Sequence, residues 1–373
     1  MKSKRRASRA PAAAVTRAAT AHSVPEAFAG RSPLTMVPLQ ARHYLLAMVT
    51  LIVLAMASGL VHAAPKKDFR MAWSVYAGWM PWPYAQQSGI LKKWADKYGI
   101  TIQVQQVDYI ESINQFTAGQ FDVCLMTNMD ALTIPAAGGV DTTALIIGDY
   151  SNGNDGLVLK GKSSLKDIKG QKVNLLELSV SHYFLARALE SVGLSERDVK
   201  VVNTSDADIV AAWSTRGVTA AAAWNPQLAE MRKLPGTVLV YDSSKIPGEI
   251  LDMTMVNTQV LKDNPALGKA LVGAWFETLA LMNKGDAKAV QAKTAMAQLA
   301  GTDLPGYEAQ LKATKMFWTP AEALAFTTAP SLVTGMDKVR KFSFDKGLLG
   351  EGATSVDVIG IAFPGGKTLG NTK

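Results

Sequence analysis

The apolar residues beyond position 68 follow two alternating periods. Residues 69–75 (FRMAWSV) and 100–107 (ITIQVQQV) alternate as strands do, whereas residues 89–98 (GILKKWADKY) have the spacing of a short helix. Residues 121–126 (FDVCLM) are almost wholly apolar, which is typical of a buried strand of a parallel sheet. The same pattern predicts helices at residues 111–118 and 131–137 and a strand at 143–148. This alternation predicts an α/β fold with a mostly parallel sheet and helices on both faces.

A second series of elements begins at residue 156, and it is followed by a strongly helical block from residue 264. That block has no strand rhythm of its own, so we expect it to pack back onto the first lobe. The sequence therefore predicts two α/β lobes, lobe 1 being residues 68–157 and 254–373 and lobe 2 residues 158–253. The elements predicted for lobe 2 are strands at residues 156–160, 172–176, 199–203, 220–224 and 237–241 and helices at 182–193 and 206–215.

The N-terminal residues predict the destination of the protein. A basic residue, Arg42, precedes the apolar run 44–61, and Val-His-Ala follows it with small residues where a signal peptidase cuts. We interpret residues 36–63 as a cleavable signal peptide starting at Met36, and residues 1–35 as a disordered or untranslated extension. The alternative is a retained membrane anchor, although the run is marginal in length for a bilayer. Cleavage would leave a secreted, periplasmic protein with no stable membrane insertion.

The charge of the chain argues against a nucleic-acid partner. The formal net charge is +8, but eight of the 39 basic residues and only one of the 31 acidic residues lie in residues 1–64. The remaining chain is nearly neutral, so no basic face is available for a polyanion.

Two kinds of chemistry are disfavoured by the motifs. Residues 156–163 (GLVLKGKS) match the phosphate-loop pattern G-x-x-x-x-G-K-[ST], but their Leu-Val-Leu-Lys insert favours an extended strand rather than a curled loop. Beyond the leader the chain has one histidine, His182, and one cysteine, Cys124, which cannot build the common zinc sites. We therefore expect no metal, no cofactor and no disulfide. His182 is interpreted either as a residue in the first turn of a helix or as a ligand contact.

Polar, acidic or aromatic residues follow five predicted strands, in both lobes. In open α/β sheets, ligands bind beyond the carboxyl ends of the strands. Each of these residues alone is a weak signal, because Asn, Asp and Ser also favour turns and helix caps. Together they predict one ligand site in a cleft between the lobes. The candidate ligand-binding residues after the strands are Trp79, Asn128, Asp130, Asp155, Ser181, His182, Trp224 and Asn225. Within the run 76–85 (YAGWMPWPYA), Trp79 is the preferred ligand-facing ring, and Trp82 and Tyr84 are expected to pack.

Five segments of the chain carry a family likeness: the loop containing Gly78, residues 116–123 (FTAGQFDV), 165–173 (LKDIKGQKV), the Ser-His helix start at 181–182, and 223–226 (AWNP). In this order they resemble segments of the periplasmic solute-binding proteins of ABC transporters. The likeness is to the nitrate/sulfonate/taurine (NMT1/THI5-like) superfamily, which also includes thiamine-precursor binders, and it covers residues 69 to about 363. It implies the type II periplasmic-binding-protein fold, with two doubly wound lobes around a central cleft and a hinge.

A narrower likeness concerns the ligand. The segments SVYAGWMPW, TNMDALT, DYSNGND and AWNPQL resemble urea-transport binding proteins associated with urea carboxylase, which implies a small nitrogen-rich ligand. The residues agree, because Asp130, Asp155 and Glu177 stand near strand ends, and Glu249 and Asp252 stand where the chain should return to lobe 1. Carboxylates accept hydrogen bonds from urea or guanidinium, whereas anion binders need donors and positive charge. Glu249 and Asp252 are therefore added to the candidate site.

These observations lead to one expected function and two alternatives. We expect a monomeric binding protein, not an enzyme, that closes around urea, guanidine or a similar small molecule and delivers it to an ABC transporter permease with its ATPase. One alternative is a sulfonate, nitrate, taurine or thiamine-pyrimidine precursor binding protein. The other is an enzyme akin to the thiamine-pyrimidine synthases, in which His182 would be catalytic.

Overall fold

The computed structural model describes residues 43, 48, 66–364 and 368–371. The chain divides between Ala63 and Ala64, and the unit Ala64–Lys373 contains every sheet of the described residues. The predicted extension, signal peptide or anchor at residues 1–63 falls outside the described residues, apart from His43 and Met48. Within the part of the chain that is described, no helix is long and apolar enough to cross a membrane.

The first sheet has the strand order β13-β12-β4-β10-β3-β1-β2, with β11 paired to β4. Strands β1, β2 and β3 are mutually parallel, as the alternation of strands and helices predicts. The strands of this sheet are β1 (Asp68–Trp73), β2 (Thr101–Gln106), β3 (Val123–Thr127), β4 (Thr142–Ser151), β10 (Leu251–Asn257), β11 (Thr314–Met316), β12 (Ile361–Ala362) and β13 (Thr368–Leu369).

The sequence pattern predicts a mostly parallel sheet and no strand beyond residue 241, and both expectations are wrong for the first sheet. Strand β10 is antiparallel to both β3 and β4, because the returning chain enters the sheet beside the end of β3, with Asp252 opposite Thr127, and must run the other way. The block after residue 264 also contains strands, namely β11, β12 and β13. These have two or three residues each, which is too short for an alternating pattern to show.

The second sheet has the order β7-β6-β8-β5-β9. Strands β6, β7 and β8 are parallel, whereas β5 is antiparallel to β8 and β9, so this sheet is also mixed. The chain passes directly from β4 into β5 and back through β10, so the second sheet is inserted into the first. Its strands are β5 (Asp155–Lys160), β6 (Lys172–Leu175), β7 (Lys200–Asn203), β8 (Ala220–Trp224) and β9 (Thr237–Asp242).

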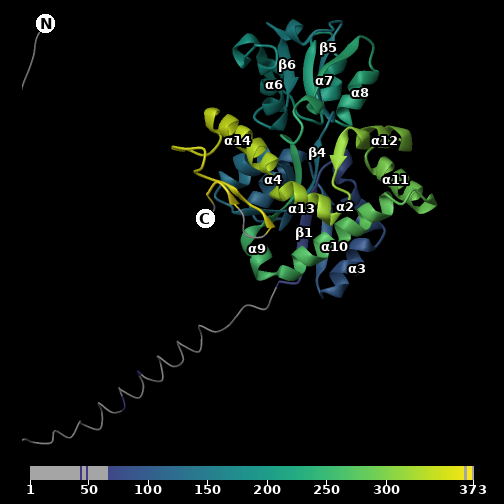
Figure 1. The fold of residues 1–373 in the computed structure, drawn as a ribbon, viewed down its shortest axis with the longest axis vertical. Helices are drawn as coiled ribbons and strands as arrows, with labels where there is room; N and C mark the ends of the chain where they lie inside the picture. Colours follow the sequence, from purple (N-terminus) through teal and green to yellow (C-terminus); the bar gives the residue numbers. More distant parts are fainter. Residues whose placement is uncertain (1–42, 44–47, 49–65, 365–367, 372–373) are drawn as a thin grey trace, which may run out of the picture. The chain divides into compact units, whose positions relative to one another are not determined.

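We call each sheet with the helices around it a lobe. Figure 1 shows α6, α7 and α8 around the second sheet and α3 and α10 beside the first. The precise boundaries 68–157, 254–373 and 158–253 stay a prediction. The α-helices are α2 (Pro81–Gln87), α3 (Ile90–Lys97), α4 (Tyr109–Thr117), α5 (Asn128–Ala131), α6 (Val180–Glu190), α7 (Ile209–Ser214), α8 (Gln227–Lys233), α9 (Thr258–Asp263), α10 (Pro265–Met282), α11 (Ala287–Leu299), α12 (Leu304–Lys312), α13 (Pro320–Thr328) and α14 (Pro330–Asp345). The shorter turns are η1 (Ala77–Trp79), η2 (Leu132–Ala136), η3 (Leu165–Ile168), η4 (Glu196–Asp198) and η5 (Ser243–Lys245).

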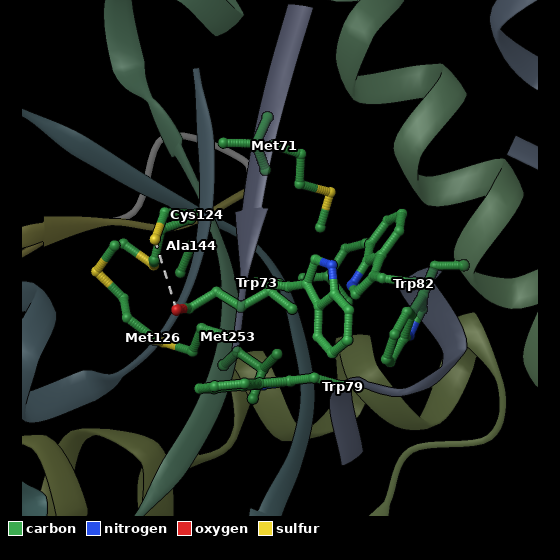
Figure 2. Close-up of a cluster of buried hydrophobic side chains, with 14 of the residues drawn as sticks. Met71, Trp73, Trp79, Trp82, Cys124, Met126, Ala144 and Met253 are labelled. Carbon is green, nitrogen blue, oxygen red and sulfur yellow. Dashed lines mark hydrogen bonds between the residues drawn. The ribbon is translucent and has the colours of Figure 1, made fainter. Parts of the chain in front are cut away.

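A large apolar core fills the first lobe. Met71, Cys124 and Met253 are buried on neighbouring strands of the first sheet (Figure 2). Cys124 is fully buried and burial raises the pKa of its thiol to about 12, so it is an inert core residue. The second lobe has smaller cores on the two faces of its own sheet. Rigid packing on the sheets fixes the strand ends that carry the polar residues.

The segment that matches a phosphate loop is an ordinary strand. Residues 155–160 form β5, with Leu157, Val158 and Leu159 fully buried. After this strand the chain makes a turn at Gly161 and then the 3-10 turn η3, rather than an α-helix whose N-terminus could hold a phosphate.

Candidate functional site

A narrow cavity lies between the two lobes, beyond the carboxyl ends of the parallel strands. The free space is small, since the centre of a water molecule can occupy only about 20 Å³ of it. This is close to the space of one or two water molecules, so a ligand of only a few atoms fits without rearrangement. The lining residues are Tyr76, Trp79, Tyr109 and Thr127 from the first lobe, Asp155, Val180 and Trp224 from the second, and Ile250, directly before β10, and Asp252, on β10, where the chain returns to the first sheet.

Aromatic rings form one continuous wall of the cavity. Tyr76 meets Trp79 edge to face with ring centroids 5.1 Å apart, and Trp79 lies 5.8 Å from Tyr109. Tyr109 in turn contacts Trp224, with centroids 5.7 Å apart. Tyr109 begins α4 in the first lobe and Trp224 ends β8 in the second, so this contact spans the cleft. Such a wall offers flat π faces that attract a planar cation.

The segment after β1 divides its tryptophans between cavity and core. Residues 77–79 form a single 3-10 turn, and Pro81 then starts α2 at a position where its missing N–H costs nothing. The turn directs Trp79 to the cavity, whereas Trp82 is fully buried and stacks on Trp275. Figure 2 shows both tryptophans together with the buried side chains of the first sheet. The expectation that Trp82 packs is confirmed.

Two buried carboxyls face each other at the base of the cavity. Asp252 on β10 lies directly opposite Asp149 on β4, and the two are close enough to share a hydrogen bond when one is protonated. The Tyr76 hydroxyl donates to Asp149 Oδ1 at 2.9 Å, while no described residue donates to Oδ2 of either aspartate. Burial raises the pKa of Asp149 to about 7, and burial together with Asp149 and Asp155 holds the pKa of Asp252 well above its usual value.

Gly78 permits this arrangement because nothing larger fits beside the carboxyl. A Cβ at this position would lie 2.4 Å from Asp149 Oδ2 and 2.6 Å from the ring of Tyr76. The glycine is therefore required by close approach rather than by an unusual backbone angle.

Two further buried aspartates lie at the cavity. Asp155 begins β5, and burial raises the pKa of its carboxyl to about 6. Asp130 Oδ2 accepts hydrogen bonds from Tyr109 at 2.6 Å and from Thr127 at 2.8 Å, and its Oδ1 lacks a partner within the described part of the chain. Burial raises the pKa of Asp130 to about 6, an effect partly offset by Tyr109, Thr127 and the backbone N–H of Val180.

The electrostatic character of the cavity is acidic. Among the described residues that line it, none is Lys or Arg, and the charged groups are carboxyls. The same described residues contain no group of His, Cys, Asp and Glu placed to hold a metal ion. The cavity is therefore suited to a small organic molecule that carries N–H donors.

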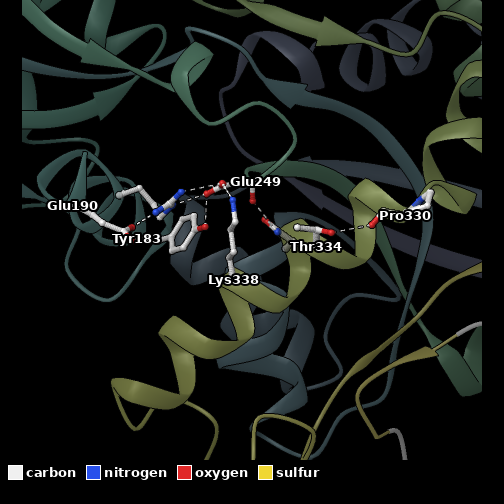
Figure 3. Close-up of polar contacts among 8 residues, drawn as sticks. Tyr183, Glu190, Glu249, Pro330, Thr334 and Lys338 are labelled. Carbon is white, nitrogen blue, oxygen red and sulfur yellow. Dashed lines mark hydrogen bonds and ion pairs between the residues drawn. The ribbon is translucent and has the colours of Figure 1, made fainter. Parts of the chain in front are cut away.

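Glu249 does not line the cavity but connects three parts of the protein (Figure 3). Its carboxylate accepts hydrogen bonds from Tyr183 at 2.6 Å and from Arg187 Nε at 2.8 Å, both on α6, and from Lys338 on α14 at 2.5 Å. Burial raises the pKa of Glu249, but the hydrogen bonds from Arg187 and Lys338 outweigh this effect and leave the pKa below its usual value. The geometry gives Glu249 a role in joining the segment before β10 to both lobes.

His182 is also turned away from the cavity. Its Nδ1 accepts from the backbone N–H of Leu178 at 3.1 Å, and its Nε2 lies 2.5 Å from Glu196. Ser179 caps α6 by accepting from the N–H of Ser181. His182 is thus an early residue of α6 held by structural partners, and its ring has no access to a reacting molecule in the cavity.

The remaining predicted residues support the cavity from outside. The Asn128 side chain donates to the Glu249 carbonyl at 3.0 Å and accepts from the Leu251 N–H at 3.2 Å, which fixes the entry to β10. Asn225 is buried and its N–H donates to the Asn154 carbonyl. Ser181 is buried next to the lining residue Val180, and none of the residues that the structure describes forms a hydrogen bond with its Oγ.

The structure therefore brings four of the ten predicted residues to the cavity: Trp79, Asp155, Trp224 and Asp252. Asp130 contacts the lining residues Tyr109 and Thr127, and the other five lie behind the cavity or away from it. Sequence reasoning missed Tyr76, Tyr109, Thr127, Val180, Ile250 and Asp149. Three of these carried a readable signal, because Tyr76, Thr127 and Asp149 each stand at the end of a predicted strand.

Comparison with known proteins agrees with this architecture. The family described as NMT1/THI5 like matches residues 157–285. The taurine-binding periplasmic protein of Escherichia coli (strain K12) is 27% identical over 143 residues, which cover 37% of this chain and 44% of that protein. The chain thus spans less than half the length of the curated relatives that it matches.

Solved structures show the fold over a longer stretch. The alkanesulfonate-binding protein SsuA from Xanthomonas axonopodis pv. citri, bound to MOPS, superposes with a TM-score of 0.62 at 16% identity, covering 77% of this chain and 96% of that one. The periplasmic aliphatic sulphonate binding protein SsuA from Escherichia coli gives a TM-score of 0.63 at 17% identity, covering 76% and 94%. The two-lobed α/β fold of periplasmic binding proteins is therefore confirmed.

Proposed function

We propose that this chain is the periplasmic solute-binding component of an ABC transporter for a small, planar, nitrogen-rich solute such as urea or guanidine. The solute would be enclosed by hinge closure of the two lobes and delivered to a membrane permease with its ATPase. The observation that carries the ligand class is the carboxyl of Asp252, which lines the cavity opposite the buried Asp149 and whose Oδ2 has no donor among the described residues.

The chemistry of the cavity matches such a solute on three counts. Buried acceptors without a donor are costly, and an N–H group of a ligand would satisfy Oδ2 of the lining residue Asp252. The faces of Trp79 and Trp224 provide flat walls for a planar molecule. The small free volume accepts a molecule of a few heavy atoms and excludes a long one.

The transport role rests on the fold and on the names of relatives. The taurine-binding relative is periplasmic by its name, and the superposed SsuA structures are binding proteins. The predicted signal peptide at residues 36–63 would take this chain to the same compartment. No reaction is proposed, since His182 is held by Leu178 and Glu196 away from the cavity.

A sulfonate ligand is the second candidate, because the named relatives bind taurine or sulfonates. Against it, a sulfonate would enter a dry cavity beside Asp149, Asp155 and Asp252 with no lining Lys or Arg among the described residues. Placing like charges together in a low-dielectric site is strongly unfavourable. The acidic cavity therefore favours the nitrogen-rich solute.

Isothermal titration calorimetry on the protein recovered from the periplasm after expression of the full chain tests the proposal. Urea, guanidinium chloride, taurine and nitrate are titrated at low millimolar concentration. Binding of urea or guanidinium without binding of the two anions is expected. Tight binding of taurine or nitrate, with neither nitrogen compound bound, would contradict the ligand class, and failure to recover the protein from the periplasm would contradict the location.

A further inference from the structure

We propose that the cavity distinguishes a guanidinium or amidinium cation from its neutral isostere urea, and that the Asp149–Asp252 pair makes this choice in a pH-dependent way. This inference rests on the proposed function, because it divides the nitrogen-rich ligand class into its charged and uncharged members. It makes Asp252 the ligand-contacting carboxyl and Asp149 a positioning residue that acts through Asp252.

The geometry places the pair in two layers. Asp252 on β10 lines the cavity. Asp149 is fully buried behind it, directly opposite on the neighbouring strand β4. The Tyr76 hydroxyl donates to Asp149 Oδ1, so Oδ2, which lies at the close contact with Gly78, is the oxygen left to share a proton with Asp252. A proton shared by the two carboxyls satisfies both Oδ2 atoms when no ligand donates to them.

Three other titratable groups face the pair, and one of them, Asp155, also titrates in the pH range of the test. They are Tyr76 from the segment after β1, Asp155 from β5 and Tyr307 from α12. Burial raises the pKa of both tyrosines, so both stay protonated near neutral pH. Asp155, whose pKa burial raises to about 6, is mostly ionised at pH 7 and adds a negative charge that favours a cation.

The two protonation states of the pair recognise different ligands. With its proton, the pair can donate through Asp252 to an acceptor such as the carbonyl oxygen of urea. Without it, Asp252 is an acceptor only and suits the N–H edge of a guanidinium, which remains charged throughout this range of pH. Cation binding therefore favours loss of the proton to solvent, and urea binding favours its retention.

The unpartnered oxygens also select among cations. A quaternary ammonium such as choline would satisfy the aromatic wall of Trp79, Tyr109 and Trp224 but would leave Oδ2 of the lining residue Asp252 without a donor once the pair has lost its proton. A planar cation with N–H groups on its edges satisfies both the rings and the carboxylates. Guanidinium or amidinium is thus preferred over methylated cations.

Calorimetry at constant ionic strength, from about pH 5.5 to about pH 7.5, with guanidinium chloride, urea and choline as separate probes, tests the inference. Guanidinium affinity should rise with pH, by at most about tenfold per pH unit, while urea affinity should fall. Parallel pH dependences, equal or tighter binding of urea at the higher pH, or tighter binding of choline would each overturn the inference and leave the proposed solute-binding role standing. Binding of no nitrogen compound would overturn the proposed ligand class as well.

Isosteric variants separate the two layers of the pair. Asp252→Asn should weaken guanidinium binding by about 10- to 100-fold and urea binding much less, because a charge-assisted hydrogen bond is lost. Asp149→Asn should retain guanidinium binding but weaken its pH dependence, since the new amide donates to Asp252 without a titrating proton and the remaining dependence comes from Asp155. An unchanged pH dependence in Asp149→Asn would overturn the assignment of that residue.

A matched control for the pair is Asp122→Asn. Asp122 is a buried carboxyl that precedes β3 and bonds to Lys66 and to the backbone of Arg70, away from the cavity. Its replacement should leave both pH dependences unchanged, and circular dichroism melting curves show which variants are folded. The wild-type pH dependences alone keep the inference testable if a variant does not fold.

Discussion

The ring of Tyr109 meets the ring of Trp224 edge to face, with centroids 5.7 Å apart and planes inclined by 67°. The first belongs to the helix that follows β2, and the second to the last position of β8. Since these elements belong to different lobes, the contact closes one side of the cavity and exists only while the lobes are together. It links closure of the cleft to the shape of the ligand site.

Replacing Trp224 tests this link. Trp224→Ala should weaken ligand binding by about tenfold, because it removes both an edge-to-face contact worth about 0.5–1.5 kcal/mol and a wall of the cavity. Trp224→Phe keeps a ring and should retain most of the affinity. Calorimetry and thermal melting measure the two effects; equal losses of affinity in both variants would show that the ring contact does not matter.

The close contact at Gly78 predicts a large effect from a single methyl group. Gly78→Ala should lower the free energy of unfolding by about 1–3 kcal/mol, because the added Cβ overlaps Asp149 Oδ2 and the ring of Tyr76. The control is Gly217→Ala, where a Cβ would meet nothing within 4 Å and the change should lie within about 1 kcal/mol. Thermal unfolding is the appropriate measurement, since urea and guanidinium are candidate ligands. Similar melting temperatures for the two variants would contradict the packing argument.

The buried aspartates predict that stability falls as pH rises. Burial raises the pKa of Asp130 and Asp155 to about 6 and that of Asp149 to about 7, against about 3.9 in an unfolded chain. Between these values the folded protein holds protons that the unfolded chain has lost. The stabilising contribution is therefore present below about pH 4 and is lost as pH rises through 6 to 7.

Melting temperatures of the ligand-free protein should accordingly decrease from about pH 5 to about pH 7.5. Glu249 does not interfere in this window, because the hydrogen bonds that hold its pKa low confine its titration to more acidic solution. In the Asp155→Asn variant, the melting temperature should decrease less over this pH range. A melting temperature that rises with pH over this window would contradict the assignment of buried, protonated carboxyls.

Lys346 forms an ion pair that joins the end of α14 to the second lobe, with Nζ 2.6 Å from Glu196. Lys346→Met should weaken ligand binding by about two- to fivefold, mainly through faster dissociation, because a partly exposed pair contributes about 0.5–1 kcal/mol to closure. The control is Lys341→Met, whose partner Asp345 lies on the same helix and cannot affect closure. Stopped-flow dissociation rates that are the same for both variants would exclude a role for the Lys346 pair in closure.

Much of the fold could be predicted from local patterns. Three predicted elements correspond to β1, β3 and α6, namely the strands at residues 69–75 and 121–126 and the helix at 182–193. Their types could be predicted because they follow from the arrangement of apolar residues within each segment. The antiparallel direction of β10 could not be predicted, since it depends on where the chain re-enters the first sheet. Strands as short as β12 carry too few residues to show a period.

The residues of the candidate site, like the fold, could be predicted only in part. Position after a strand identified Trp79, Asp155 and Trp224, because strand ends meet at one edge of a sheet. It also selected His182 and Asn128, which lie near the same edge but turn toward structural partners. Side-chain direction depends on neighbours that are distant in the sequence, so residue type and strand position alone could not separate these two groups.

By itself, the sequence determined the two α/β lobes, the aromatic segment after the first strand and the surplus of acidic residues at strand ends. These are properties of short segments, set by side-chain period and composition. Only the tertiary structure decided that Asp149 lies opposite Asp252, because their contact needs β10 to return antiparallel beside β4. It likewise decided that Tyr109 would meet Trp224, since 115 positions of chain separate them and only the closed lobes bring the rings together.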